Sequence, residues 1–311
     1  MNSRAQSSRA QCSRALALIA LLAGACAIGF APIFVRLTET GPAAAGFWRM
    51  FLALPLLAPF LFQPGKPAPL KPSLPILLAG LFFAGDLALW HYGIGMTSVA
   101  NATVLANLTP IVVTVAGFLI FREKVGALFL LGMGLGLIGA WTMAEGRGAG
   151  APGTNPPVGD ALSAATALFY AGYFFCVRQA RASFGTTAVM FWSSLVTAAA
   201  LGAVMLLLGE QVIPASLAGW GACLGLAVVH VTGQGAIAWA LGRLPTPTAS
   251  VVVLVQPAVA AALGWMIFSE AMTPLQGLGA LLALAGVAVA QWASARDQAK
   301  DRAMAAQSKV Q

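Results

Sequence analysis

The sequence predicts an all-α polytopic membrane protein with ten transmembrane helices, arranged as two five-helix inverted repeats around a central cavity. Of its 311 residues, 59% are hydrophobic and only 8% are charged, whereas a soluble domain carries about 25% charged residues. Apolar runs of about 20 residues, the length that spans a bilayer, recur from end to end. A long internal repeat is the third observation, and repetition of this kind decides architecture.

The repeat relates the stretch 99–124 to the stretch 246–272, and residues 99–124 fall on residues 246–271 without a gap. Matched prolines, glycines, phenylalanines and glutamates lie 147 positions apart, as in Pro110 with Pro257, Gly117 with Gly264, Phe121 with Phe268 and Glu123 with Glu270. Apolar bias inflates any match between membrane segments, but matched Pro, Gly, Phe and Glu are harder to obtain by accident. The protein is therefore predicted to consist of two related halves.

Ten segments are predicted to span the membrane, at 15–35, 43–62, 73–96, 99–121, 125–144, 159–177, 187–208, 216–241, 247–268 and 274–293. The first run is too long for the apolar region of a signal peptide, so we expect it to remain as a span. The stretch 145–157 is rich in Gly and Pro and divides the halves. The predicted division is a tail at 1–14, a first repeat at 15–144, an external linker at 145–157, a second repeat at 158–293 and a tail at 294–311.

Basic residues orient the chain, because Lys and Arg accumulate on the cytoplasmic side of membrane proteins. With the N-terminus inside, 14 of the 17 Lys and Arg residues fall on the cytoplasmic side, and only Arg36 and Arg147 fall outside. Both tails are then cytoplasmic. Five spans per half is an odd number, so the second half enters the membrane from the opposite side. Inverted repeats are typical of transporters that bind substrate near the midplane.

These features resemble the drug/metabolite transporter superfamily, and within it the bacterial exporters with EamA domains. The resemblance covers residues 15–293 and rests on the two halves, the central prolines of spans four and nine, the Phe-x-Glu ends, and FWRMF at 47–51. It implies export of amino acids, drugs or other metabolites across the inner membrane of a bacterium. It also implies that spans one, three, four, six, eight and nine surround the cavity.

Two charges fall inside spans, Arg49 in span two and Asp86 in span three. Charges at this depth are costly and therefore mark functional candidates. One interpretation is that Arg49 is a structural charge. It would then either form a buried ion pair with Asp86 on the neighbouring helix or extend outward toward the membrane surface. The other is that Asp86 binds a proton or a substrate amine.

Polar residues on other spans are candidate lining residues of the cavity. His91 and His230 both lie within spans, and His230 shares a helical face with Gln234. Interhelical hydrogen bonding is the alternative for these side chains. Thr103 and Asn107 share a face with Pro110 on span four, while span nine carries Gln256 beside Pro257. Proline kinks a helix, so Pro110 and Pro257 are predicted hinges.

Aromatic residues give the substrate prediction. Tyr170 and Tyr173 share a face of span six, and Trp90 lies at depth on span three. An aromatic-lined cavity suits flat apolar molecules by stacking, or organic cations, although packing against neighbours explains the same rings. Small residues on spans five and ten predict close packing within the bundle, at Gly132, Gly136, Gly139, Gly279, Ala283 and Gly286.

The predicted function is export of small metabolites by alternating access, with aromatic and other hydrophobic amino acids first. A multidrug or organic cation exporter is the alternative. An intramembrane enzyme is the alternative from another class, but the sequence has no HExxH motif and no nucleophile with a nearby base. We expect no cofactor, no metal and no nucleic-acid partner. The expected partners are a small-molecule substrate and the lipid bilayer. We expect a monomer, with a homodimer as the alternative.

The predicted topology is testable by thiol labelling of single cysteines. In a variant without the native cysteines, Pro152→Cys should react with a membrane-impermeant maleimide added to intact cells. Pro67→Cys should react only after the membrane is permeabilised. The reverse pattern contradicts the orientation and, with it, the predicted cytoplasmic tails.

Overall fold

The computed structural model describes residues 2–61, 72–109, 111–112, 115, 126–146, 153–181, 183–241 and 255–307, and all regular structure in these residues is helical. Six of the described helical segments are long and apolar enough to cross a membrane, and shorter apolar helices lie at 127–143, 255–268 and 274–290. The predicted all-α polytopic class is therefore confirmed.

Helices occur at the predicted spans, but the first begins at Asn2 and the last ends at Gln307, inside the predicted tails, and parts of spans four and nine lie outside the described residues. In the first half they are α1 (Asn2–Ile28), α2 (Ala31–Leu37), α3 (Pro42–Phe51), α4 (Ala53–Leu57), η1 (Ala58–Phe60), α5 (Leu74–Met96), α6 (Val99–Ala106) and α8 (Ala127–Glu145). In the second half they are α9 (Pro156–Arg181), α10 (Thr186–Leu207), α11 (Leu217–Val229), the π-helix η2 (His230–Gln234), α12 (Gly235–Leu241), α14 (Val255–Phe268) and α15 (Pro274–Gln307).

Local chemistry explains where several helices start. The helices α3, α9 and α15 each begin at a proline, whose fixed φ suits the first helical position and whose missing N–H costs nothing there. Ser98 and Ser216 cap α6 and α11, since their hydroxyls accept hydrogen bonds from the N–H groups of Asn101 and Gly219, both at 3.1 Å.

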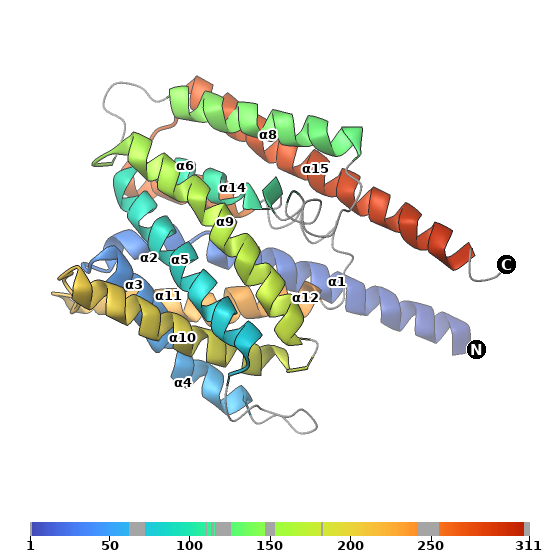
Figure 1. The fold of residues 1–311 in the computed structure, drawn as a ribbon, viewed down its shortest axis with the longest axis horizontal. Coiled ribbons are helices and arrows are strands. Elements are labelled where there is room, and N and C mark those ends of the chain that lie inside the picture. Colours follow the sequence, from blue (N-terminus) through green and yellow to red (C-terminus); the bar gives the residue numbers. More distant parts are fainter. Residues whose placement is uncertain are drawn as a thin grey trace.

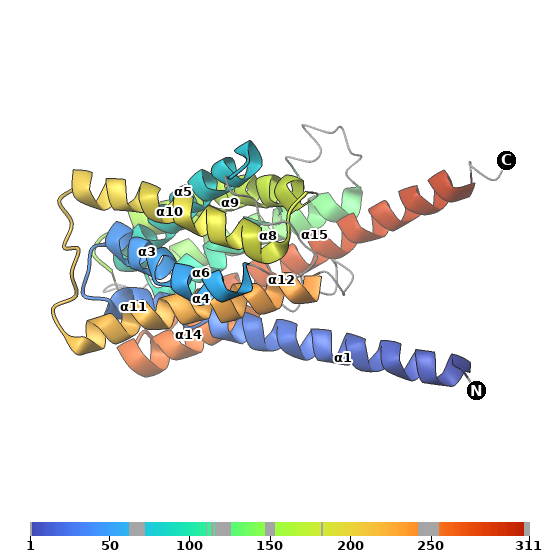
Figure 2. The same ribbon diagram turned by 90° about the horizontal axis from the view of Figure 1, so that it is seen from below.

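Helix pairing follows the internal repeat. The packed pair α5 and α9 is the repeat equivalent of the packed pair α12 and α1. In the same way, the contact of α6 with α9 is equivalent to that of α14 with α1. The halves are inverted, because α5 ends at the same end of the bundle at which α11 begins. At that end the side chain of Arg36 binds the last carbonyls of α5, while nearby Glu39 binds the N-terminus of α11. We call this end the latched end. The two termini lie at the opposite end of the bundle (Figures 1 and 2).

The helices α8 and α15 lie side by side along the outside of the bundle (Figure 1). Their glycines face each other, and a Cβ on Gly286 would lie 2.2 Å from the backbone nitrogen of Gly136. The small residues predicted to pack closely therefore do so within one chain, as they do in other membrane bundles where lipid provides no hydrophobic drive for helix association.

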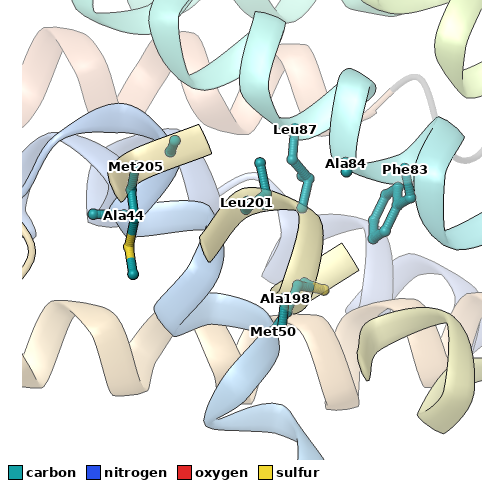
Figure 3. Packing of buried hydrophobic residues seen from close by; sticks show 9 residues of the cluster. Ala44, Met50, Phe83, Ala84, Leu87, Ala198, Leu201 and Met205 are labelled. Atoms are coloured by element: carbon teal, nitrogen blue, oxygen red, sulfur yellow. The ribbon is translucent and has the colours of Figure 1, made fainter. Parts of the chain in front are cut away.

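Two glycine–phenylalanine contacts join α5 to α9. The ring of Phe169 fills the space over Gly85, and the ring of Phe82 fills the space over Gly172. Behind them, the largest apolar cluster ties α5 to α3 and α10. Figure 3 shows Phe83, Ala84 and Leu87 facing side chains of the other two helices, among them Met50 and Leu201. This packing fixes the helices that carry Arg49 and Asp86.

The α8–α15 contact predicts a position-specific effect of side chains at glycine. Gly286→Val should lower the melting temperature and the folded yield in detergent, because the added atoms overlap the backbone of α8 at a cost of about 1–3 kcal/mol or more. Gly134→Val on α8 is the matched control, since a Cβ there meets nothing within 4 Å. Equal thermal stability of the two variants contradicts this packing.

Candidate functional site

A group of charged and aromatic side chains meets in the interior of the bundle. It comprises Arg49 on α3, Asp86, Trp90, His91 and Phe83 on α5, Tyr170 and Tyr173 on α9, and His230 in η2, and we call it the central cluster. Arg49 is seven residues from the start of α3 at the latched end, and Asp86 is ten residues from the end of α5. At about 1.5 Å per residue, both lie roughly 10–15 Å from that end, which is near the midplane of a 30 Å hydrocarbon core.

Arg49 is the centre of this cluster. Its side chain is only 3% exposed, and its Nε and Nη1 atoms have no hydrogen-bond partner among the described residues. Its Cζ atom lies 6.0 Å from the centroid of the Trp90 ring. Asp86, 6% exposed, is within electrostatic range, but the described ion pairs with an N–O distance of 4.0 Å or less do not include Arg49 with Asp86. The two charges are neighbours that do not touch.

The two histidines flank Arg49 from different helices. His91 places Nδ1 at 3.0 Å from the carbonyl oxygen of Pro42, which requires the proton on Nδ1 and leaves Nε2 as an acceptor. His230 places Nε2 at 3.3 Å from the hydroxyl of Ser194. Nε2 of His91 and Nδ1 of His230 are buried without a partner in the described residues. Interhelical bonding, the alternative at these positions, thus accounts for one nitrogen of each ring.

A stack of three aromatic rings lies beside the charges. Phe83 and Tyr173 stack with centroids 4.6 Å apart and planes 24° apart, and Tyr170 stacks on Tyr173 at 5.6 Å and 16°. The ring of His230 lies 5.9 Å from that of Phe83. Phe83 was not among the predicted site residues, although the internal repeat aligns it with His230, which is the signal that could have found it.

Residue Gln234, in η2 of the second half, joins this stack at Tyr170. Its side-chain amide approaches the hydroxyl of Tyr170 at 3.5 Å. His230 and Gln234 are the first and last residues of the π-helix η2. Such single-turn π-helices often occur at functional sites, so the local backbone favours the predicted role of both residues.

The predicted polar face of span four is bonded within its own helix. The hydroxyl of Thr103 donates to the carbonyl of Val99 at 2.7 Å, and the amide of Asn107 donates to the carbonyl of Thr103 at 2.8 Å. Helix α6 ends at Ala106 with Asn107 as its C-cap. Pro110, the first predicted hinge, lies outside the described residues.

The second predicted hinge lies near the start of α14. Pro257 is buried in the first turn of this helix, where a proline breaks no hydrogen bond of the described helix. A kink would involve the residues before Val255, which lie outside the described part of the chain. Gln256 precedes Pro257 and is half-buried. The structure brings neither residue into the central cluster.

At the latched end, one ion pair connects span one to the turn after span nine. The guanidinium of Arg36 donates to the carboxylate of Glu270, and also to the carbonyls of Ile94 at 2.7 Å and Thr97 at 2.6 Å. The second carboxylate oxygen of Glu270 accepts from the N–H of Val99 at 2.9 Å. Glu270 therefore neutralises Arg36 and caps α6 at its positive end.

Two further glutamates cap helices at the same end. Glu210 accepts from the N–H of Ala44 in α3 at 2.9 Å and from the hydroxyl of Tyr92. Glu39 accepts from the N–H of Ser216 at 2.9 Å, directly before α11. Each of the three glutamates binds a helix of the other half. The latched end is thus held by carboxylates bound to helix N-termini across the two halves, a feature that sequence reasoning missed.

The fold and the cluster together define the class of protein: a membrane transporter built from inverted repeats, with polar groups gathered near the midplane between the halves. Residues 15–144 and 157–291 match the EamA-like transporter family. The chain belongs to this family, and it is therefore a transporter rather than an enzyme.

Named relatives are consistent with that assignment. The chain is 25% identical over 272 residues to an uncharacterized transporter of Archaeoglobus fulgidus, covering 87% of this chain and 94% of the relative. It is 25% identical over 207 residues to the pseudopaline exporter CntI of Pseudomonas aeruginosa, covering 67% and 71%. A protein of known crystal structure shares the fold, with a TM-score of 0.60 and 18% identity over 91% of this chain and 96% of that one.

The ion pair at the latched end predicts a change in accessibility. In a cysteine-free background, Ile94→Cys places a buried thiol beneath the Arg36 contacts. Adding Glu270→Gln should speed its reaction with maleimide in detergent by about tenfold, since a lost hydrogen bond to a charged group costs about 1.5–3 kcal/mol.

Glu145→Gln is the matched control, because Glu145 is an exposed glutamate at the same end of the bundle, on α8. It should leave the labelling rate unchanged. Equal rates for Glu270→Gln and Glu145→Gln are the result that contradicts a latch.

Proposed function

We propose that this protein exports aromatic and other hydrophobic amino acids across a bacterial-type inner membrane by alternating exposure of the central cluster. The observation that carries the proposal is the stack of Phe83, Tyr173 and Tyr170 beside two opposite charges inside the bundle. Aromatic rings bind flat apolar side chains by offset stacking, and charges at this depth are expensive unless they have a function.

The proposal includes the predicted orientation. Both tails are cytoplasmic, the repeats occupy 15–144 and 158–293, and the latched end faces outward. Carboxylates that bridge the halves then hold the outer side shut, while substrate enters from the cytoplasm. Export is also the direction named for the Pseudomonas aeruginosa relative. For the substrate site to open outward, these bridges must break, and each consists of a few hydrogen bonds. A modest difference in substrate affinity between the two conformations is therefore enough to shift the equilibrium between them.

An organic cation exporter receives less support from the cluster. Trp90 and the ring stack suit a cation, and Asp86 offers a negative charge. However, Arg49 lies among these groups without an ion pair. A substrate that carries only positive charge would meet this cation in a medium of low dielectric constant, where repulsion is strong. A zwitterion avoids the conflict.

The proposal predicts selective losses when rings are removed. In proteoliposomes, Tyr173→Ala and Trp90→Ala should raise the apparent KM for phenylalanine and tryptophan by about two- to tenfold, because one stacked pair contributes about 0.5–1.5 kcal/mol. The apparent KM for alanine and threonine should change little.

Trp141→Ala removes an aromatic side chain that is 70% exposed on α8 and serves as the control. It should leave selectivity unchanged. Equal losses for large and small amino acids at normal protein yield count against stacking, and point to a general change in the shape of the site.

A further inference from the structure

Buried polar atoms without partners are concentrated at one place in this molecule. The described residues contain six such side-chain atoms, and five of them belong to Arg49, Trp90, His91 and His230. The sixth is the hydroxyl of Ser73, at the start of α5. An unpaired polar group in the interior costs about 1–3 kcal/mol, and more when it is charged, so four such residues around one arginine require an explanation.

The four residues come from three separate helical segments and converge. Arg49 on α3 lies against the Trp90 ring on α5, whose centroid is 5.6 Å from that of His91. Both His91 and His230 of η2 are within electrostatic range of Arg49. The unpaired atoms therefore surround one region and do not form scattered packing defects.

We propose that Arg49 binds the carboxylate of the transported molecule, so that it is the specificity-determining residue of the site and not a structural charge. A guanidinium is always charged, has only donors, and pairs best with an oxyanion. Its own carboxylate neighbour, Asp86, lies beyond ion-pair distance. The Trp90 indole N–H is a second unpaired donor beside it. A carboxylate is the group that satisfies both.

The remaining groups select a second feature of the ligand. Nε2 of His91 is an unpaired acceptor, because Nδ1 holds the proton that bonds the carbonyl of Pro42. Asp86 supplies a carboxylate in the same region. On this proposal, the substrate ammonium binds among these acceptors. The site thus offers donors and acceptors together, which matches a molecule with a carboxylate and an amine on one carbon, namely an α-amino acid.

The positions of these residues along their helices predict how the ligand is oriented. Arg49 and Asp86 lie roughly 10–15 Å from the latched end, whereas Phe83 is thirteen residues from the end of α5, or roughly 20 Å. The charged ends of the substrate would face the latched end, and its side chain would lie deeper on the stack. The inference deepens the proposed function and rests on it for the identity of that side chain.

The test compares phenylalanine with phenylalaninamide, which keeps the ring and the amine but lacks the carboxylate. Purified wild-type protein should show thermal stabilisation by phenylalanine, and competition in proteoliposomes should show that the amide inhibits uptake at least tenfold more weakly. Arg49→Gln should weaken phenylalanine by about ten- to a hundredfold, since a charge-assisted hydrogen bond is lost, and should abolish the preference over the amide. Arg296→Gln, at an exposed arginine on α15, is the control.

The results of this test distinguish a failure of the role given to Arg49 from a failure of the proposed substrate. If wild type transports phenylalanine but is inhibited equally by the amide, export of amino acids stands and the role of Arg49 is overturned. If phenylalanine neither binds nor is transported, while other small carboxylates stabilise wild type but not Arg49→Gln, the substrate proposal fails and carboxylate binding stands. If Arg49→Gln does not fold, the comparison of acid and amide on wild type decides alone. No stabilisation of wild type by any carboxylate overturns the inference.

Discussion

Glu270 holds the two halves together at the latched end, because one carboxylate neutralises Arg36 and caps α6 at the same time. Arg36 in turn occupies the last carbonyls of α5. Glu210 and Glu39 repeat the principle at α3 and α11. The first residues of α3 and α6, such as Ala44 and Val99, are fully buried, so their N–H groups need partners within the protein, and loops are short. Carboxylates from the opposite half supply the missing acceptors. The same hydrogen bonds therefore satisfy the helix ends and join the two halves.

Near the midplane, by contrast, buried polar groups are left without hydrogen-bond partners among the described residues. There Arg49, Trp90, His91 and His230 keep buried polar atoms that have no partner in the described part of the chain. The surrounding packing is close, as the cluster of α3, α5 and α10 shows (Figure 3), so these groups are held in place and cannot relax toward one another. Polar groups are paired at the latched end and left unpaired at the centre among the described residues, and our proposal explains this difference by a polar ligand that binds at the centre. A stack of rings beside the unpaired groups favours an aromatic one.

The sequence was sufficient to predict the architecture, because apolar length and the 147-residue repeat report directly on the spans and on the inversion of the halves. The orientation drawn from the basic residues stays a prediction. It was also sufficient to place Asp86, Trp90, His91, Tyr170, Tyr173 and His230 at the centre, since polar and aromatic residues inside spans are few. It could not show that Arg49 lacks an ion pair, because the gap to Asp86 depends on how α3 and α5 pack. Nor could it pair Glu39, Glu210 and Glu270 with their helices, since each partner is more than 160 residues away.

The central claim is that an amino acid lies with its carboxylate on Arg49 and its ring on the stack. Anomalous diffraction from crystals grown with 4-bromophenylalanine tests this most directly, because bromine marks the far end of the ring. The account predicts one strong bromine peak beside Phe83, Tyr170 and Tyr173, with density for the carboxylate at Arg49. Bromine found only on the lipid-facing surface, or a ligand whose carboxylate points away from Arg49, would contradict it.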